Sequence, residues 1–191
     1  MPTALLLIDI QRDYFPGGRM ELEGSLPAAM QAQKILTAFR EKKGALIHIQ
    51  HLSVRPGATF FIPGTEGVQI HPKVQPLPGE MVIQKHFPNA FRDTPLLEYL
   101  KKEGIGHLII AGMMTHMCVE ATTRAAFDLG FRCTVIQDAC ATRALNFEEK
   151  VIPASQVQAA FLAALGAVYA KIVSAEDFIS EKAAGGGISN V

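Results

Sequence analysis

Short apolar segments alternate with longer segments of helical periodicity along almost the whole chain. Six runs of four to seven residues are apolar in the manner of parallel strands that are covered on both faces. They span residues 4–10, 45–50, 81–84, 107–111, 133–137 and 170–173. Strands that alternate with helices form a parallel sheet between two helical layers, because each parallel connection must cross over the sheet. The sequence therefore predicts an α/β fold of three layers, α/β/α, around a six-stranded parallel sheet.

The segments between these strands carry helix start and stop signals. Pro27 suits the first turn of a helix that ends at Gly44. Ser174 begins a capping box ahead of a last short helix. Further helices, each followed by glycine, are expected over 96–103, 118–129 and 155–165.

The 191 residues fit one domain without an internal repeat. We expect this domain to span 1–182 and to be followed by a flexible tail, 183–191, which contains three consecutive glycines. Residues 51–80 interrupt the alternation with about 30 residues of no strong period, which is typical of a lid or a binding loop.

Composition narrows the classes of partner. Lys plus Arg equals Asp plus Glu, at 18 each, so no basic surface for nucleic acid or for a membrane is expected. Hydrophobic residues make up 49% of the chain and charged residues 19%, which favours a homo-oligomer, a dimer or a tetramer. The beginning of the chain has no signal-peptide pattern, and no apolar run approaches the ~20 residues of a membrane span. A soluble, cytoplasmic protein with a small-molecule substrate is expected.

Ligands of open α/β sheets bind beyond the carboxyl ends of the strands. Asp9 lies there, inside the otherwise apolar stretch LLLIDIQ. A buried carboxylate without a partner is costly, so this position favours a general base, although an acid that caps a nearby loop is also compatible. Lys85 ends the third run. Taken alone, it is interpreted as a solvated lysine at the end of a strand. Beside an acid and a thiol, its positive charge would stabilise negative charge.

Cys118 follows the fourth strand and a turn, at the start of a predicted helix. The helix dipole makes a thiol in this place more acidic, which indicates a nucleophile. Most cysteines are small buried hydrophobes, and Cys133 and Cys140 are interpreted in that way. None of the three has metal-binding CxxC spacing.

Three stretches carry a family resemblance: ALLLIDIQRDYF, VIQKHFPNAFRDTPL and IIAGMMTHMCVEATTRAAFDLGF. They resemble the isochorismatase-like cysteine hydrolase superfamily, which includes nicotinamidases and N-carbamoylsarcosine amidohydrolases. The resemblance extends from Leu5 to about Phe178, and the pattern G-x-x-T-x-x-C-V at 112–119 is specific. It implies a Rossmann-like, isochorismatase-like topology.

The resemblance also implies roles for individual residues. Asp9 matches the general base, Lys85 the lysine and Cys118 the nucleophile of the family. A cis peptide bond maps onto Met113–Met114, and the backbone N–H groups of Met114 and Cys118 would form the oxyanion hole.

Departures from the family narrow the chemistry. Nicotinamidases bind a metal through a D-x-H arrangement after the second strand, where this chain has His48-Ile-Gln-His51 and no aspartate. His71 stands far along the following loop, so no metal and no cofactor is expected. Isochorismatases proper, which hydrolyse a vinyl ether, lack the cysteine.

We therefore expect a cysteine-dependent hydrolase that cleaves an amide or carbamoyl C–N bond through a thioester. An isochorismatase-type vinyl-ether hydrolase, a nicotinamidase-like enzyme, a binding protein without turnover and a redox role remain alternatives. The side chains expected to contact the substrate are aromatic, Met or His residues near the strand ends or on the long loop. They are Tyr14, Phe15, Phe60, Phe61, Phe87, Met114 and His116.

Overall fold

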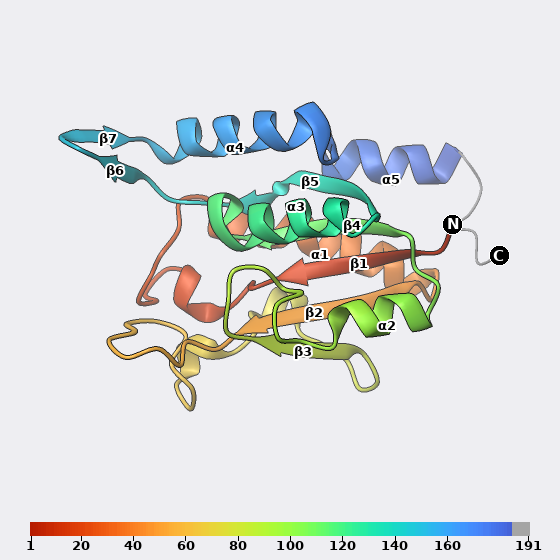
Figure 1. Cartoon of the computed structure of the whole chain (residues 1–191), viewed down its shortest axis with the longest axis horizontal. Helices are drawn as coiled ribbons and strands as arrows, with labels where there is room; N and C mark the ends of the chain where they lie inside the picture. Colours follow the sequence, from red (N-terminus) through yellow and green to blue (C-terminus); the bar gives the residue numbers. More distant parts are fainter. Residues whose placement is uncertain (185–191) are drawn as a thin grey trace.

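A parallel sheet of six strands forms the centre of the computed structural model, which describes residues 1–184 (Figure 1). The strand order is β3-β2-β1-β4-β5-β8, so the chain begins in the middle of the sheet and builds outward in both directions. The predicted fold class is confirmed. The strands are β1 (Thr3–Ile8), β2 (Ala45–His51), β3 (Met81–Lys85), β4 (His107–Met113), β5 (Arg132–Ala141) and β8 (Lys171–Val173).

Helices cover both faces of the sheet, as expected for the three layers. On one face lie α1 (Ser25–Glu41) and α5 (Ala175–Ala184), whose rings Phe39 and Phe178 stack in parallel. The other face carries α2 (Leu96–Lys102), α3 (Glu120–Asp128) and α4 (Ala154–Val168).

Strand β1 supplies both halves of the core. All six of its residues are buried: Leu5 and Leu7 face the layer of α1 and α5, whereas Leu6 and Ile8 face the opposite layer. Alternate side chains of a strand point to opposite faces, which is why a doubly covered strand is apolar throughout.

Several boundaries differ from the prediction. Strand β5 continues to Ala141, because a register shift against β4 near Gly112 lets pairing resume beyond the predicted end. The chain enters α3 through a π-helical turn, Thr115–Val119, so Cys118 lies inside this turn and not at the first residue of a helix. Of the predicted flexible tail, 183 and 184 end α5, and 185–191 lie outside the described residues.

A two-stranded antiparallel hairpin, β6 (Leu145–Phe147) and β7 (Lys150–Ile152), was not predicted. Each strand has three residues, too few for a strand period to be recognised. The predicted cap of the last helix is confirmed, because the Ser174 hydroxyl accepts the N–H of Asp177 at 3.0 Å. Within residues 1–184, no helix combines the length and the apolar character that a membrane crossing needs.

Candidate active site

The ends of three parallel strands bring Asp9, Lys85 and Cys118 together. Asp9 directly follows β1, Lys85 is the last residue of β3, and Cys118 lies in the π-helical turn after β4. Asp9 has a φ of 51°, an uncommon value for a residue other than glycine, so the chain turns sharply where the strand ends. A carboxylate oxygen of Asp9, the sulfur of Cys118 and a ring nitrogen of His51 all lie within 4.8 Å of one another.

The ammonium group of Lys85 has a partner for each of its three protons. It lies 2.7 Å from Oδ2 of Asp9, 2.9 Å from Nδ1 of His51 and 3.1 Å from the carbonyl oxygen of Phe87. Both side chains of the Asp9–Lys85 ion pair are fully buried. Burial alone would lower the pKa of Lys85, but Asp9 and, to a smaller extent, Cys118 together outweigh burial and the pKa is raised. Lys85 is therefore a fixed, permanent cation of the site.

The thiol of Cys118 is not pre-ionised. Burial raises its pKa, the nearby Asp9 carboxylate adds to this, and Lys85 only partly opposes both. The expected lowering of its pKa by a helix dipole is not found, because Cys118 lies inside the π-helical turn and is only 5% exposed, so burial dominates. A protonated thiol needs a base, and the adjacent carboxylate is that of Asp9.

The backbone before the thiol has an unusual geometry. The peptide bond between Met113 and Met114 is cis. Gly112 has a φ of +142°, and a Cβ there would lie 2.1 Å from the carbonyl oxygen of Ile8. Only glycine allows β4 to approach β1 this closely just before the turn that carries Met114 and Cys118. The oxyanion role of these two amides stays a prediction.

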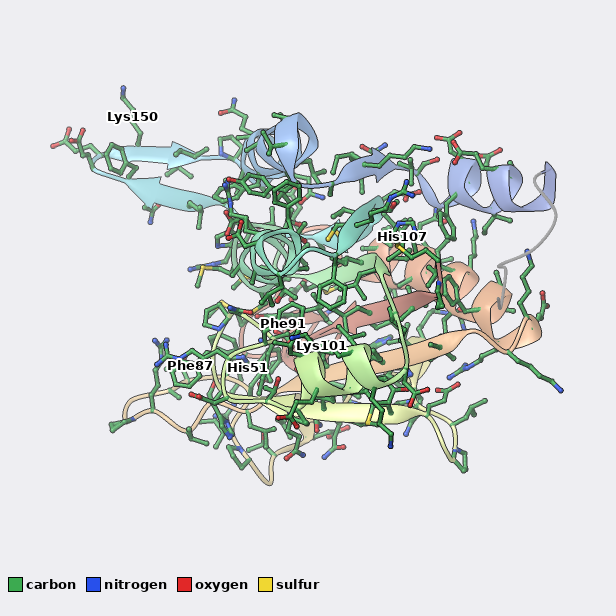
Figure 2. All side chains as sticks on the ribbon, turned by 45° about the vertical axis from the view of Figure 1, so that its right-hand side comes forward. His51, Phe87, Phe91, Lys101, His107 and Lys150 are labelled. Carbon is green, nitrogen blue, oxygen red and sulfur yellow. The ribbon has the colours of Figure 1, made fainter. Side chains whose placement is uncertain are left out.

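A cavity of about 330 Å³ opens beside Cys118 at this end of the sheet. Figure 2 shows the side chains of His51 and Phe87, which belong to its wall, close together at this end. Its wall contains three aromatic rings, two Met side chains, two histidines and one arginine. The lining residues are Tyr14, His51, Ser53, Val54, Arg55, Phe60, His86, Phe87, Pro88, Met114, Met117 and Cys118.

Four of the predicted substrate contacts line this cavity, namely Tyr14, Phe60, Phe87 and Met114. The guanidinium of Arg92 lies 3.6 Å above the ring of Phe87 and holds that wall in place.

The structure places the other three predicted contacts elsewhere. Phe15 stacks on His71 at 3.8 Å and faces a separate, polar hollow. Phe61 is fully buried, and its ring packs 5.0 Å from that of Phe60. The ring of His116 forms a hydrogen bond with the Thr142 hydroxyl. The path of the loop decides which of two neighbouring aromatic residues reaches the cavity. This path cannot be read from the position of a residue in the sequence.

The histidines that were considered as metal ligands point to three different places. Nε2 of His48 lies 3.0 Å from Glu80, and Nδ1 of His71 accepts the backbone N–H of Lys73. His51, with Asp9 and Cys118, has the spacing of a metal site. However, the Lys85 ammonium contacts both Asp9 and His51, so a cation already lies where a metal would have to bind. This donor set does not fit a resident metal.

Sequence reasoning placed His51 at a strand end but left it out of the catalytic group. The strand order contained the missing signal: β2 lies between β1 and β3, and His51 is paired in register with Lys85. The end of β2 is therefore flanked by the ends that carry Asp9 and Lys85.

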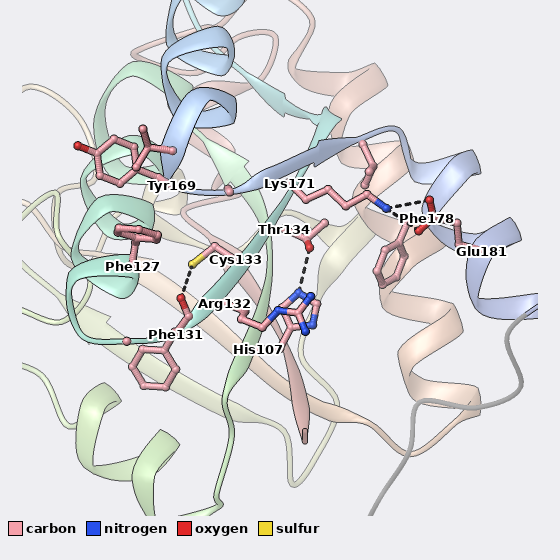
Figure 3. A pocket seen from close by; sticks show the side chains of 14 residues that line it. His107, Phe127, Phe131, Arg132, Cys133, Thr134, Tyr169, Lys171, Phe178 and Glu181 are labelled. Atoms are coloured by element: carbon pink, nitrogen blue, oxygen red, sulfur yellow. Dashed lines mark hydrogen bonds and ion pairs between the residues drawn. The ribbon is translucent and has the colours of Figure 1, made fainter.

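A larger cavity, of about 660 Å³, lies at the opposite end of the sheet, near the first residues of β4, β5 and β8 (Figure 3). Polar groups around it pair with one another. His107 forms a hydrogen bond of 2.9 Å with the Thr134 hydroxyl, and Lys171 forms an ion pair with Glu181 at 2.8 Å. It lies at the amino ends of these strands, away from Asp9, Lys85 and Cys118. The smaller cavity beside Cys118 is therefore the candidate active site.

Known proteins resemble this chain over most of its length. The family profile described as the isochorismatase domain matches residues 3–175. The isochorismatase family protein YddQ of Bacillus subtilis is 49% identical over 179 residues, which cover 94% of this chain and 99% of YddQ. A solved structure from Oleispira antarctica, of an isochorismatase-type hydrolase, is 47% identical with a TM-score of 0.90. The match covers 94% of this chain and 96% of that one.

A streptothricin hydrolase of Streptomyces noursei is 34% identical over 140 residues, which are 73% of this chain and 54% of that protein. The family match extends from β1 to the start of α5 and includes the strand ends that carry Asp9, Lys85 and Cys118. This chain belongs to the isochorismatase family of hydrolases.

Proposed function

We propose that this protein is a cysteine hydrolase that cleaves an amide or carbamoyl C–N bond of a small molecule through a thioester intermediate. The observation that carries the proposal is the buried group of Asp9, Lys85 and Cys118, whose sulfur faces a cavity of about 330 Å³. A thiol, a base within reach and a fixed cation are the parts that covalent acyl transfer requires.

The first half of the reaction acylates the thiol. Asp9 takes the proton of Cys118, and the sulfur attacks the carbonyl carbon of the substrate. The negative charge on oxygen is stabilised by the amides of Met114 and Cys118; one such donor is worth about 3–4 kcal/mol in hydrolases. Asp9 then passes its proton to the leaving nitrogen, and the C–N bond breaks to give the thioester and an amine.

The second half hydrolyses the thioester. Asp9 accepts a proton from water, and the hydroxide adds to the acyl carbon. The C–S bond breaks, and the proton on Asp9 returns to the sulfur, so that one water is consumed for each acid and amine released. Lys85 remains charged throughout, because the carboxylate beside it raises its pKa. It balances the negative charge that moves between Asp9 and Cys118.

The cavity wall supports a small substrate with a flat or apolar part. Tyr14, Phe60 and Phe87 present aromatic rings, and Met114 an adaptable thioether. The volume of the cavity limits the substrate to a small molecule.

The function is tested by an ammonia-release screen over small amides and ureides, with the wild type, Cys118→Ala and Cys133→Ala in parallel. Cys133 is buried on β5 and outside the cavity, so its variant is the matched control. We expect release by the wild type and the control and none above background by Cys118→Ala. Full activity of Cys118→Ala would overturn the nucleophile. Incubation with isochorismate, followed by a pyruvate assay, separates the vinyl-ether alternative.

A further inference from the structure

The ring of His51 contacts the catalytic lysine directly. His51 ends β2 and is the register partner of Lys85 on β3, and its Nδ1 lies 2.9 Å from the lysine nitrogen. An ammonium group can only donate hydrogen bonds. Nδ1 must therefore be the acceptor, and the proton of the neutral ring is on Nε2.

The surroundings keep this ring neutral. Burial lowers the pKa of His51 to about 4, and the nearby carboxylate of Asp9 only partly opposes this. The cations Lys85 and Arg55 and the ring of His86 lower it further. The titratable or charged groups near the ring are Asp9, Arg55, Lys85, His86 and Cys118. At neutral pH the ring is an uncharged acceptor.

The backbone of His51 is fixed by a second buried side chain. Oε1 of Gln11 accepts the N–H of His51 at 2.7 Å, and Nε2 of Gln11 donates to the His51 carbonyl at 2.9 Å. Gln11 is fully buried and also donates to the carbonyl of Val68 at 2.8 Å. The loop after β1 and the end of β2 are thus locked together, and the place of the imidazole is set before a substrate binds.

We propose that His51 is a positioning residue for Lys85. As a neutral imidazole it accepts one N–H of the ammonium and thereby holds the charge between Asp9 and Cys118. Without this acceptor, the ammonium loses one of its hydrogen bonds inside a buried site, and the cation shifts from its place or loses its proton. This inference rests on the proposed function and names a fourth residue of the same site.

The proposal predicts a specific change in the reactivity of the thiol. The ammonium stabilises the Cys118 thiolate, so its displacement makes the thiol harder to ionise. Iodoacetamide reacts with the thiolate, and its rate of reaction with Cys118 can be followed from pH 6 to pH 10 by mass spectrometry of the Cys118 peptide. This measurement needs no substrate.

His51→Leu and His51→Ala lack an acceptor. In these variants we expect iodoacetamide to alkylate Cys118 about tenfold more slowly than in the wild type at a given pH. In His51→Asn the amide oxygen can take the place of Nδ1, so alkylation should stay within about threefold of the wild type. The matched control is His71→Leu, the same change at a histidine that stacks on Phe15 outside the cavity, and it should follow the wild-type profile.

Two results would overturn the role of His51. The first is a His51→Leu profile that coincides with the wild type. The second is a His51→Asn profile as slow as that of His51→Leu, which would mean that the acceptor is not what matters. If His51→Leu does not fold, the comparison of His51→Ala with His51→Asn decides.

The same variants separate this inference from the proposed function. If wild type and His51→Asn turn over an amide whereas His51→Leu has a lower kcat at a similar KM, the proposed function and the role of His51 are both supported. If the His51 variants turn over like the wild type while Cys118→Ala is inactive, the proposed function stands and the role of His51 fails. If the alkylation pattern holds but no C–N bond is cleaved, the positioning role stands and the proposed function fails.

Discussion

Asp9 and Lys85 form a fully buried ion pair, an arrangement that stability alone does not explain. Their charged atoms lie 2.7 Å apart. Desolvation of two charges offsets much of their attraction, so a buried ion pair is weak evidence for a stabilising role. The pair is better explained by the neighbouring thiol, whose ionisation Asp9 opposes and Lys85 favours. The two charges have opposite effects on the pKa of Cys118: Asp9 raises it and Lys85 lowers it. An experiment that measures the ionisation of the thiol can therefore distinguish their contributions.

Asp9→Asn should lower turnover and yet make the thiol more reactive. Loss of the general base should reduce kcat by about 10²–10⁴-fold. The carboxylate also raises the pKa of Cys118, so its removal lowers that pKa and increases the thiolate fraction at a given pH. Alkylation of Cys118 by iodoacetamide at pH 8 should therefore be faster than in the wild type. Slower alkylation would contradict this account of the thiol.

At this scale, the sequence predicted the residues at strand ends better than those in loops. The structure brings Asp9, Lys85 and Cys118 together, because the carboxyl ends of neighbouring parallel strands meet at one edge. Phe15 lines a different hollow, and Phe61 lies buried behind the cavity wall, although each adjoins a predicted contact in sequence. No periodicity in the sequence fixes which way a loop side chain points.

At the scale of elements, the six strands of the sheet and the helices on its faces were predictable from hydrophobic period and end signals. The hairpin β6–β7 was not, because its strands are short and their apolar residues are largely exposed. The order of the strands was also absent from the prediction. Without it, His51 on β2 could not be placed beside Lys85 on β3.

Glu80, in the loop just before β3, connects this loop to α1 and β2. Its carboxylate accepts two hydrogen bonds from Arg40 of α1, at 2.7 and 2.8 Å, and lies 3.0 Å from His48 of β2. It also accepts the backbone N–H of Leu77 at 2.9 Å. Burial alone would raise the pKa of Glu80, but these partners outweigh it and lower the pKa to about 2.

Glu80→Gln should remove a pH-dependent contribution to the free energy of unfolding. A lowered pKa means that folding favours the carboxylate, so this contribution is present above pH 4.5 and is lost as the pH falls toward 2. The wild type should exceed Glu80→Gln by up to about 3 kcal/mol in free energy of unfolding at pH 7. Urea unfolding at pH 7, 4 and 2.5 measures the difference, which should shrink with the pH.

The matched control is Glu181→Gln, which removes an ion pair with Lys171 whose side chains are more than half exposed. Such a pair contributes at most about 1 kcal/mol, so this variant should differ little from the wild type at any of the three pH values. A difference for Glu80→Gln that stays constant from pH 7 to pH 2.5 would contradict the role assigned to its carboxylate.

At the scale of the whole molecule, the two ends of the sheet differ in what they offer a ligand. The carboxyl ends of the strands present a buried thiol, a base and a cation beside an aromatic cavity. The amino ends present a larger cavity, where the polar side chains of β4, β5 and β8 bond to one another or to α5. Cavity size alone would select the amino ends, whereas the placement of the thiol, the carboxylate and the ammonium selects the carboxyl ends, where ligands of open α/β sheets bind.

The hairpin β6–β7 extends beyond the rest of the molecule (Figure 1). Its side chains Phe147 and Val151 are 66% and 68% exposed. A two-stranded hairpin is marginally stable in water unless another surface packs against it. Together with the 49% hydrophobic content of the chain, this favours a homo-oligomer in which the hairpin contacts a second copy.

Sedimentation equilibrium at about 20 µM should therefore give a mass of at least twice the 20.7 kDa of one chain. The double variant Phe147→Glu, Val151→Glu should shift the mass toward the monomer, because like charges would be buried in the interface and would repel those of the second copy. Leu26→Lys introduces a charge at another exposed apolar position, on α1, and should leave the assembly intact. A monomeric wild type would refute the oligomer. An unchanged mass for the double variant would instead place the interface away from the hairpin.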